Sequence, residues 1–265
     1  MYKAVLGLMN RSALQREVAG LRFRSYTEGM ERKVMDLRFR SPIGLAAGFD
    51  TRGRYYNAVS AYGCSFDFVG PLQLSEKEGL KGAVNNVTAT PPGDIILGMN
   101  ITKQDGSTTE EQIKQDYLTA FAYSFDFCDL SILNFSDTAI GAVHEYTFIQ
   151  EVTDAVLDAR ISYDDFHPIL LRLSPGLKPG ELDPILDYSL MNGVDGVMVC
   201  GMDLVKQVVA FSKGRLPVIA VARISKGEEA AALLDAGASL IALDTTPGEF
   251  SAGLMKKIFK SLKTK

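Results

Sequence analysis

The sequence contains few residues of the kinds that hold metals or cross-links. Its three cysteines, Cys64, Cys128 and Cys200, are odd in number and have neither zinc-ligand nor CxxC spacing. The two histidines, His144 and His167, stand far apart without ligand spacing. We therefore expect no metal site, and the unpaired thiols predict a reducing, cytoplasmic location.

Long apolar runs and a strong excess of charge of one sign are also absent. No apolar run approaches the length of a membrane span, and the first residues lack the apolar stretch of a secretory signal. The 28 basic and 32 acidic residues leave a net charge of −4. This balance gives no reason to expect nucleic acid or an anionic membrane surface. We expect a small-molecule ligand, no transmembrane segment and no nucleic-acid partner, and leave a homodimer open.

The sequence is rich in short apolar runs that alternate with amphipathic stretches. With 265 residues, of which 46% are hydrophobic, the chain can bury a sizeable core. The runs predict strands at 43–47, 66–70, 94–98, 128–133, 168–173, 196–199, 217–221 and 240–243. They are apolar on both faces, as parallel strands covered by helices are.

Amphipathic segments fill most of the gaps between these strands. They predict helices at 55–62, 108–125, 146–160, 181–191, 204–211, 226–236 and 248–262. Eight such strand units within residues 41–265 indicate an α/β fold, a TIM (β/α)8 barrel. A doubly wound open sheet is disfavoured, because no Gly-x-Gly-x-x-Gly follows any strand.

Two parts of the chain do not follow this alternation. Residues 1–40 have no clear period and are predicted to form an N-terminal capping segment under the barrel, with one helix around 13–21. Between Gly70 and Asp94 the chain is turn- and strand-like. We therefore expect the second helix of the barrel to be missing or irregular.

The functional groups of a TIM barrel follow the carboxyl ends of its strands. Asn134 ends a buried strand, where its amide serves either a ligand or its own loop. Asp137 is either a helix cap or a general base. Arg172 needs an anionic partner, either a ligand or a carboxylate such as Asp137.

The loops after the seventh and eighth strands are the usual phosphate-binding place of this fold. A phosphate favours glycines there, because backbone N–H groups must approach it. Here the loops contain Arg223, which could bind a phosphate, and Asp244, which would repel one. The favoured interpretation is an ion pair between Arg223 and Asp244.

Several segments of the chain are distinctive when taken together. Residues 41–50 read SPIGLAAGFD, in which small residues leave the backbone open to something flat. Others are LGMNI at 97–101, Asn134 with Ser136, PILLRLSP at 168–175, DGV at 195–197, LPVIAV at 216–221 and AGASL at 236–240. In this order they resemble the dihydroorotate dehydrogenase family, most closely its class 2 branch.

The resemblance implies an FMN-containing barrel that oxidises dihydroorotate to orotate in pyrimidine biosynthesis, with a side-chain base taking a proton while hydride passes to the flavin. The implied cofactor contacts are Ala46, Ala47, Gly48, Asn100, Asn134, Arg172, Arg223 and Thr245. The implied substrate contacts are Thr51, Asn134 and Ser136, and Asp137 stands at the position of the base.

The sequence departs from the family pattern at the site itself. Thr51 and Arg172 stand where the family has lysines, and 200–202 and 137–140 lack two substrate asparagines and a threonine. Arg223 and Asp244 replace a glycine and a tyrosine. Each lost hydrogen bond costs about 1–3 kcal/mol, so dihydroorotate binding would weaken by roughly 4–8 kcal/mol.

These departures predict a degenerate active site with weak FMN loading. Three functions stay open at this point. They are a working FMN oxidoreductase, a barrel repurposed for another small anionic ligand, and a non-catalytic homologue that contacts a protein partner.

Overall fold

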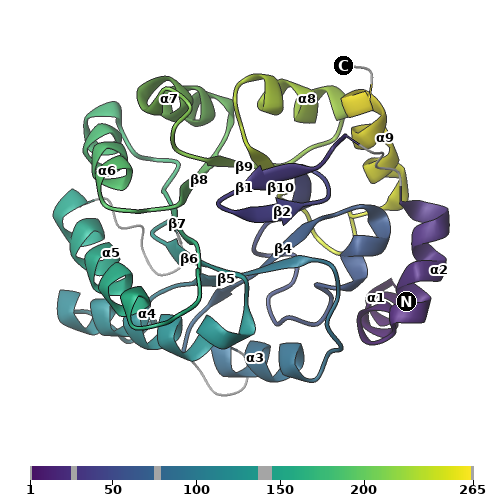
Figure 1. The fold of residues 1–265 in the computed structure, drawn as a ribbon, viewed down its shortest axis with the longest axis horizontal. Coiled ribbons are helices and arrows are strands. Elements are labelled where there is room, and N and C mark those ends of the chain that lie inside the picture. Colours follow the sequence, from purple (N-terminus) through teal and green to yellow (C-terminus); the bar gives the residue numbers. More distant parts are fainter. Residues whose placement is uncertain (1, 25–28, 75–78, 137–144, 264–265) are drawn as a thin grey trace.

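The structure, a computed structural model, describes residues 2–24, 29–74, 79–136 and 145–263. Parallel strands close into a barrel in the order β10-β3-β4-β5-β6-β7-β8-β9 (Figure 1). They are β3 (Ile43–Leu45), β4 (Phe66–Leu72), β5 (Ile96–Ile101), β6 (Leu130–Asn134), β7 (Ile169–Arg172), β8 (Gly196–Cys200), β9 (Val218–Ala222) and β10 (Leu240–Leu243). All lie at the predicted places, so the prediction of a TIM barrel is confirmed.

Helices surround this barrel on its outside (Figure 1). They are α3 (Leu80–Thr88), α4 (Glu110–Ser124), α5 (Tyr146–Ile161), α6 (Pro179–Met191), α7 (Met202–Ser212), α8 (Gly227–Asp235) and α9 (Ala252–Lys263), with 3-10 helices η1 (Ala58–Tyr62) and η2 (Phe125–Phe127). The helices predicted from residue 108 onward are confirmed as α4 to α9. Within the described ranges, none has the length and apolarity needed to cross a bilayer.

The predicted absence of a second barrel helix is wrong, because α3 occupies that place. Its buried residues Leu80, Ala83 and Val84 follow the spacing of an amphipathic helix. Glycine, two asparagines and three β-branched residues lower the helix propensity of this segment and concealed the pattern. It is the first helix of the barrel that is short. The helix predicted at 55–62 forms only the 3-10 helix η1, which is capped by Gly63 with φ 95°.

The chain before the barrel begins with α1 (Tyr2–Arg11) and α2 (Ala13–Phe23), which lie beside η1. The helix predicted around 13–21 is confirmed as α2, whereas α1 was not predicted. Phe23 stacks on Tyr62 with ring centroids 5.4 Å apart. These helices cover the side of the barrel where its first helix is short. The domain division at residue 40 stays a prediction.

A hairpin of β1 (Arg32–Val34) and β2 (Leu37–Phe39) lies across the amino-terminal end of the barrel (Figure 1). Its two turn residues have φ of 52° and 56°, the left-handed geometry that matches the twist of paired strands. Phe39 meets Phe66, the first residue of β4, edge-on at 5.7 Å. The hairpin closes this end, and the carboxyl ends of the strands lie at the opposite end.

Candidate active site at the carboxyl end of the barrel

The side chains that face the barrel interior at the carboxyl ends of the strands form the candidate site. Alternate residues of a strand point inward, and the apolar interior of β6, β7 and β8 consists of Ile132, Leu170 and Met198. Two positions further along come Asn134, Arg172 and Cys200. Asn100 lies near the end of β5, where its register partner on β6 is Ile132, and Ala46 directly follows β3. The carboxyl ends of five strands, β3, β5, β6, β7 and β8, therefore each bring one of these residues to the same end of the barrel.

Asn100 is fully buried at this end of β5. Neither its Oδ1 nor its Nδ2 atom has a hydrogen-bond partner within the described part of the chain. A buried polar group without a partner costs about 1–3 kcal/mol. An unpartnered buried amide near the carboxyl end of a strand makes Asn100 a candidate for ligand contact.

Arg172 is half-buried at the end of β7, and its Nε atom is buried without a hydrogen-bond partner. Among the residues described, it forms no salt bridge with a carboxylate. Its guanidinium lies close to the Cys200 thiol. Burial raises the pKa of Cys200, the Arg172 charge and hydrogen bond oppose this, and the charge of Asp244 adds to it.

Asn134 and Ser136, both predicted to contact substrate, are bonded to each other. The Asn134 Oδ1 atom accepts from the Ser136 N–H at 3.0 Å and from its hydroxyl at 2.9 Å. This is a turn in which an asparagine side chain bonds to the backbone two residues on. For this oxygen the structure supports the loop alternative. Asp137 lies outside the described residues, so its role as a base stays a prediction.

The backbone at Ala46, Ala47 and Gly48 forms an open platform beside the barrel mouth. Gly48 has φ 114°, is exposed, and has no atom within 4 Å of the place of an added Cβ. Its N–H donates to the Gly70 carbonyl at 2.8 Å, and that of Ala46 donates to the Leu243 carbonyl at 3.0 Å. These bonds hold the platform flat against its neighbouring strands.

Asp50 fixes the loop that follows this platform, and the sequence interpretation missed this role. Its buried carboxylate accepts from the backbone N–H groups of Arg52 at 3.2 Å, Arg54 at 2.9 Å and Tyr55 at 2.5 Å. Burial raises the pKa of Asp50, and these N–H groups oppose the effect. Thr51 is exposed on the same loop.

The loops after β9 and β10 meet at a cleft of about 410 Å³ lined by Arg223, Asp244, Thr245 and Glu249. The predicted Arg223–Asp244 ion pair is wrong, because Arg223 pairs with Glu249 instead. Glu249 also accepts from the Thr246 hydroxyl at 3.1 Å and N–H at 3.3 Å. Threonine followed by glutamate three residues later is a capping pattern, and this signal could have indicated the partner.

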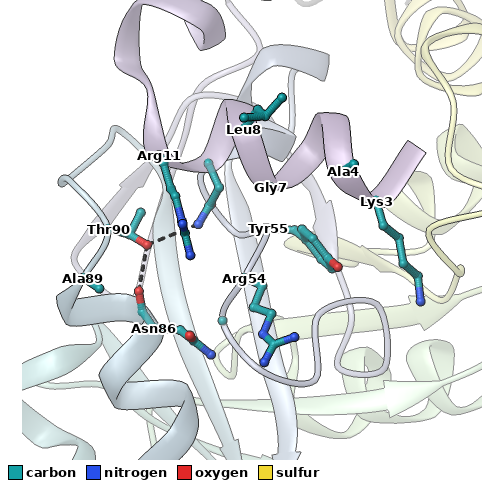
Figure 2. A pocket seen from close by; sticks show the side chains of 12 residues that line it. Lys3, Ala4, Gly7, Leu8, Arg11, Arg54, Tyr55, Asn86, Ala89 and Thr90 are labelled. Carbon is teal, nitrogen blue, oxygen red and sulfur yellow. Dashed lines mark hydrogen bonds between the residues drawn. The ribbon is translucent and has the colours of Figure 1, made fainter. Parts of the chain in front are cut away.

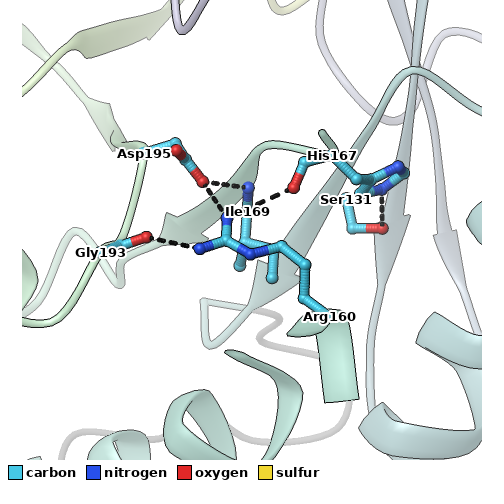
Figure 3. Close-up of polar contacts among 6 residues, drawn as sticks. All are labelled: Ser131, Arg160, His167, Ile169, Gly193 and Asp195. Atoms are coloured by element: carbon cyan, nitrogen blue, oxygen red, sulfur yellow. Dashed lines mark hydrogen bonds and ion pairs between the residues drawn. The ribbon is translucent and has the colours of Figure 1, made fainter. Parts of the chain in front are cut away.

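A second polar cluster lies at the opposite end of β7 (Figure 3). Asp195 Oδ2 accepts from Arg160 at 2.6 Å and from the Ile169 N–H at 2.8 Å. The His167 Nε2 atom lies 2.9 Å from the Ser131 hydroxyl. Burial, helped by the charge of Arg160, lowers the pKa of His167 to about 4. In the described ranges, no three His, Cys, Asp or Glu side chains are placed to hold a metal ion.

The chain resembles known proteins in both sequence and structure, although no family model matches it. It is 26% identical to the dihydroorotate dehydrogenase (quinone) of Christiangramia forsetii, over 82% of this chain and 79% of that protein. The corresponding protein of Cellvibrio japonicus is also 26% identical, over 79% and 78%. The solved dihydroorotate dehydrogenase of Eimeria tenella in complex with ferulenol has a TM-score of 0.79 at 15% identity, over 94% of this chain and 90% of that one.

Fold and site together define a (β/α)8 barrel whose polar groups gather at the carboxyl ends of its strands. The sequence likeness to the two relatives extends over about four-fifths of both chains. Curated homologues of this chain are named dihydroorotate dehydrogenase (quinone), and its barrel has the fold of a solved dihydroorotate dehydrogenase.

Proposed function

We propose that this barrel binds a small anionic molecule at its carboxyl end and no longer oxidises dihydroorotate with FMN. FMN is the cofactor that the family resemblance implies, and when bound it would accept hydride from the substrate. Two parts of the barrel can be tested for whether their residues would suit this cofactor, one for its ring and one for its phosphate. These are the platform at 46–48 and the cleft between the loops after β9 and β10.

The platform suits the flat ring of a flavin. Ala46, Ala47 and Gly48 present backbone and small side chains, and the space beside Gly48 is open. This feature alone favours the second candidate function, a working FMN oxidoreductase. It does not hold the phosphate end of the cofactor.

The cleft does not suit a phosphate. Glu249 already forms an ion pair with Arg223 and accepts a hydrogen bond from the Thr246 N–H. These are the two donors that a phosphate in this cleft would use. The Glu249 carboxylate would also repel a phosphate placed beside it, because both are negatively charged. The residues present therefore do not fit FMN as a whole, and we assign it no catalytic step.

The single observation that carries the proposal is the pair of unsatisfied groups on Asn100 and Arg172. A guanidinium and an amide near the carboxyl ends of β7 and β5 suit a small carboxylate, because both can donate to its oxygens. Asn134 is set beside them on β6 and is proposed to line the same end of the barrel. Under this proposal Asp137 has no proton to take from a substrate. A cytoplasmic location and a homodimer stay predictions.

A thermal-shift screen with orotate, benzoate, succinate, pyruvate and inorganic phosphate tests this proposal. At least one carboxylate should raise the melting temperature of the wild-type protein, and Arg172→Met should remove that rise. Arg215→Met, which removes an exposed arginine next to α7, is the matched control. If no carboxylate stabilises the protein, or if the rise survives in Arg172→Met, the proposal is wrong.

A further inference from the structure

A separate cleft lies between α1 and the outside of the barrel (Figure 2). It encloses about 430 Å³. Its walls come from α1, from the loop that Asp50 fixes, and from the end of α3. The residues that matter here are Lys3, Gly7, Arg11, Arg54 and Tyr55.

The cleft is positively charged, although the chain as a whole carries −4. Lys3, Arg11 and Arg54 line it, and no aspartate or glutamate does. None of the three forms a salt bridge with another described residue, whereas Arg40, Arg160 and Arg223 each do. Three cations without carboxylate partners around one cleft make a local positive potential that attracts anions.

The spacing of the cations leaves room between them. Lys3, Gly7 and Arg11 recur every four residues on one stripe of α1, so the two cations lie about 12 Å apart along the helix axis. Gly7 stands midway without a side chain, and no atom lies within 4 Å of an added Cβ there. Figure 2 shows Lys3 and Arg11 extending from α1 toward the loop that carries Arg54 and Tyr55.

Buried hydrogen bonds hold the walls of the cleft in place. The Asn10 Oδ1 atom accepts from the Asn57 N–H at 2.8 Å, and its Nδ2 donates to the Thr90 hydroxyl at 3.3 Å. Thr90 in turn donates to the Asn86 carbonyl at 2.7 Å. This chain of bonds joins α1 to η1 and α3, so a ligand would meet a preformed site.

We propose that this cleft binds a small molecule with two linked phosphate groups. The cations stand on two walls of the cleft, Lys3 and Arg11 on α1 and Arg54 on the loop, so each of two linked phosphates can meet the cations of one wall. The half-buried ring of Tyr55 provides a wall for the group attached to the phosphates. The proposal concerns a different site from the barrel mouth and does not rest on the function proposed there.

Isothermal titration of the full chain with pyrophosphate and with ADP tests the proposal. Both should bind to the wild-type protein, and Arg11→Gln or Arg54→Gln should each weaken binding about tenfold. Lys206→Gln removes one exposed charge from α7 and should change nothing. Equal weakening by Lys206→Gln would show diffuse attraction and overturn the proposal.

Occlusion of the cleft gives a test in which no charge changes. Gly7→Leu should abolish binding and leave the melting temperature unchanged or higher, because the space is open and the helix gains a better former. Gly180→Leu on α6, also with open space, is the matched control. Retained binding in Gly7→Leu would overturn the proposal.

A phosphate group can belong to a free molecule or to a lipid headgroup. Phosphatidylcholine vesicles with and without phosphatidic acid separate the two sources. Binding of pyrophosphate without a preference for phosphatidic acid supports the free molecule. Binding only to phosphatidic acid, or to no probe, would overturn the proposed diphosphate ligand.

Discussion

The guanidinium of Arg223 contacts the carboxylate of Glu249 where the loops after β9 and β10 meet. Both side chains are largely exposed, at 68% and 47%, so solvent screens the pair and it adds little to stability. Its main effect is on local charge, because it places a carboxylate where this fold usually binds phosphate. Change at this pair should therefore alter ligand binding more than folding.

Glu249→Gln should strengthen FMN binding about tenfold, because it removes a negative charge and frees Arg223. The free energy of unfolding should hardly change, because the lost ion pair is exposed to solvent. Quenching of FMN fluorescence measures the affinity, and Glu110→Gln on α4 is the exposed control. Unchanged or weaker FMN binding in Glu249→Gln would contradict the assignment of this cleft.

Asn100→Leu should separate stability from binding. Replacing a buried amide that has no partners with an apolar side chain of similar size should raise the free energy of unfolding by about 1 kcal/mol or more. The same variant should lose the carboxylate-dependent thermal shift. Urea unfolding and the thermal-shift assay measure the two effects. A large loss of stability would show that the amide has partners in the protein.

Asp67→Val should stabilise the protein at neutral pH. Asp67 is fully buried and neither carboxyl oxygen has a hydrogen-bond partner in the described chain. Burial and then the charge of Asp50 raise the pKa of Asp67 well above its usual value, and the nearby Phe68 N–H opposes this only in part. Stability from this group is therefore present at low pH and is lost as pH rises above about 4.

Urea unfolding at pH 7 should show a gain of about 1–3 kcal/mol for Asp67→Val. Asp67→Asn is the control, since it removes the ionisation but leaves an unsatisfied polar group. Its gain should be the smaller of the two. A loss of stability in both variants would refute this account of Asp67.

His167 should make the protein less stable in acid. Its pKa of about 4 in the folded state lies below the usual value near 6.5, so the unfolded chain takes up the proton first. Stability is full above pH 6.5 and falls toward pH 4, by about 2 kcal/mol between pH 6.5 and 5. In urea unfolding measured between pH 6.5 and pH 5, the His167→Gln variant should not show this fall in stability. If His144→Gln removes it instead, the assignment is wrong.

The alternation of apolar runs was enough to place every strand of the barrel, because buried parallel strands are apolar on both faces. The same reasoning missed α3, because Val84 and the two asparagines have low helix propensity and hide the helical spacing of its buried residues. The packing of those residues against the barrel still favours the helix. At the carboxyl end of the barrel, the end-of-strand rule singled out Arg172 and Arg223 as candidates, and the family resemblance pointed to Asn100; their roles stay predictions. The rule could not find the Arg223–Glu249 pair or the role of Asp50, because side-chain partners across a loop depend on backbone geometry.

The most direct test of the central claim is the visible absorption spectrum of the purified protein before and after incubation with excess FMN and removal of the unbound cofactor. The purified protein should be colourless, should retain little FMN and should not reduce a dye acceptor with dihydroorotate. A stoichiometric yellow FMN complex that oxidises dihydroorotate would contradict that claim.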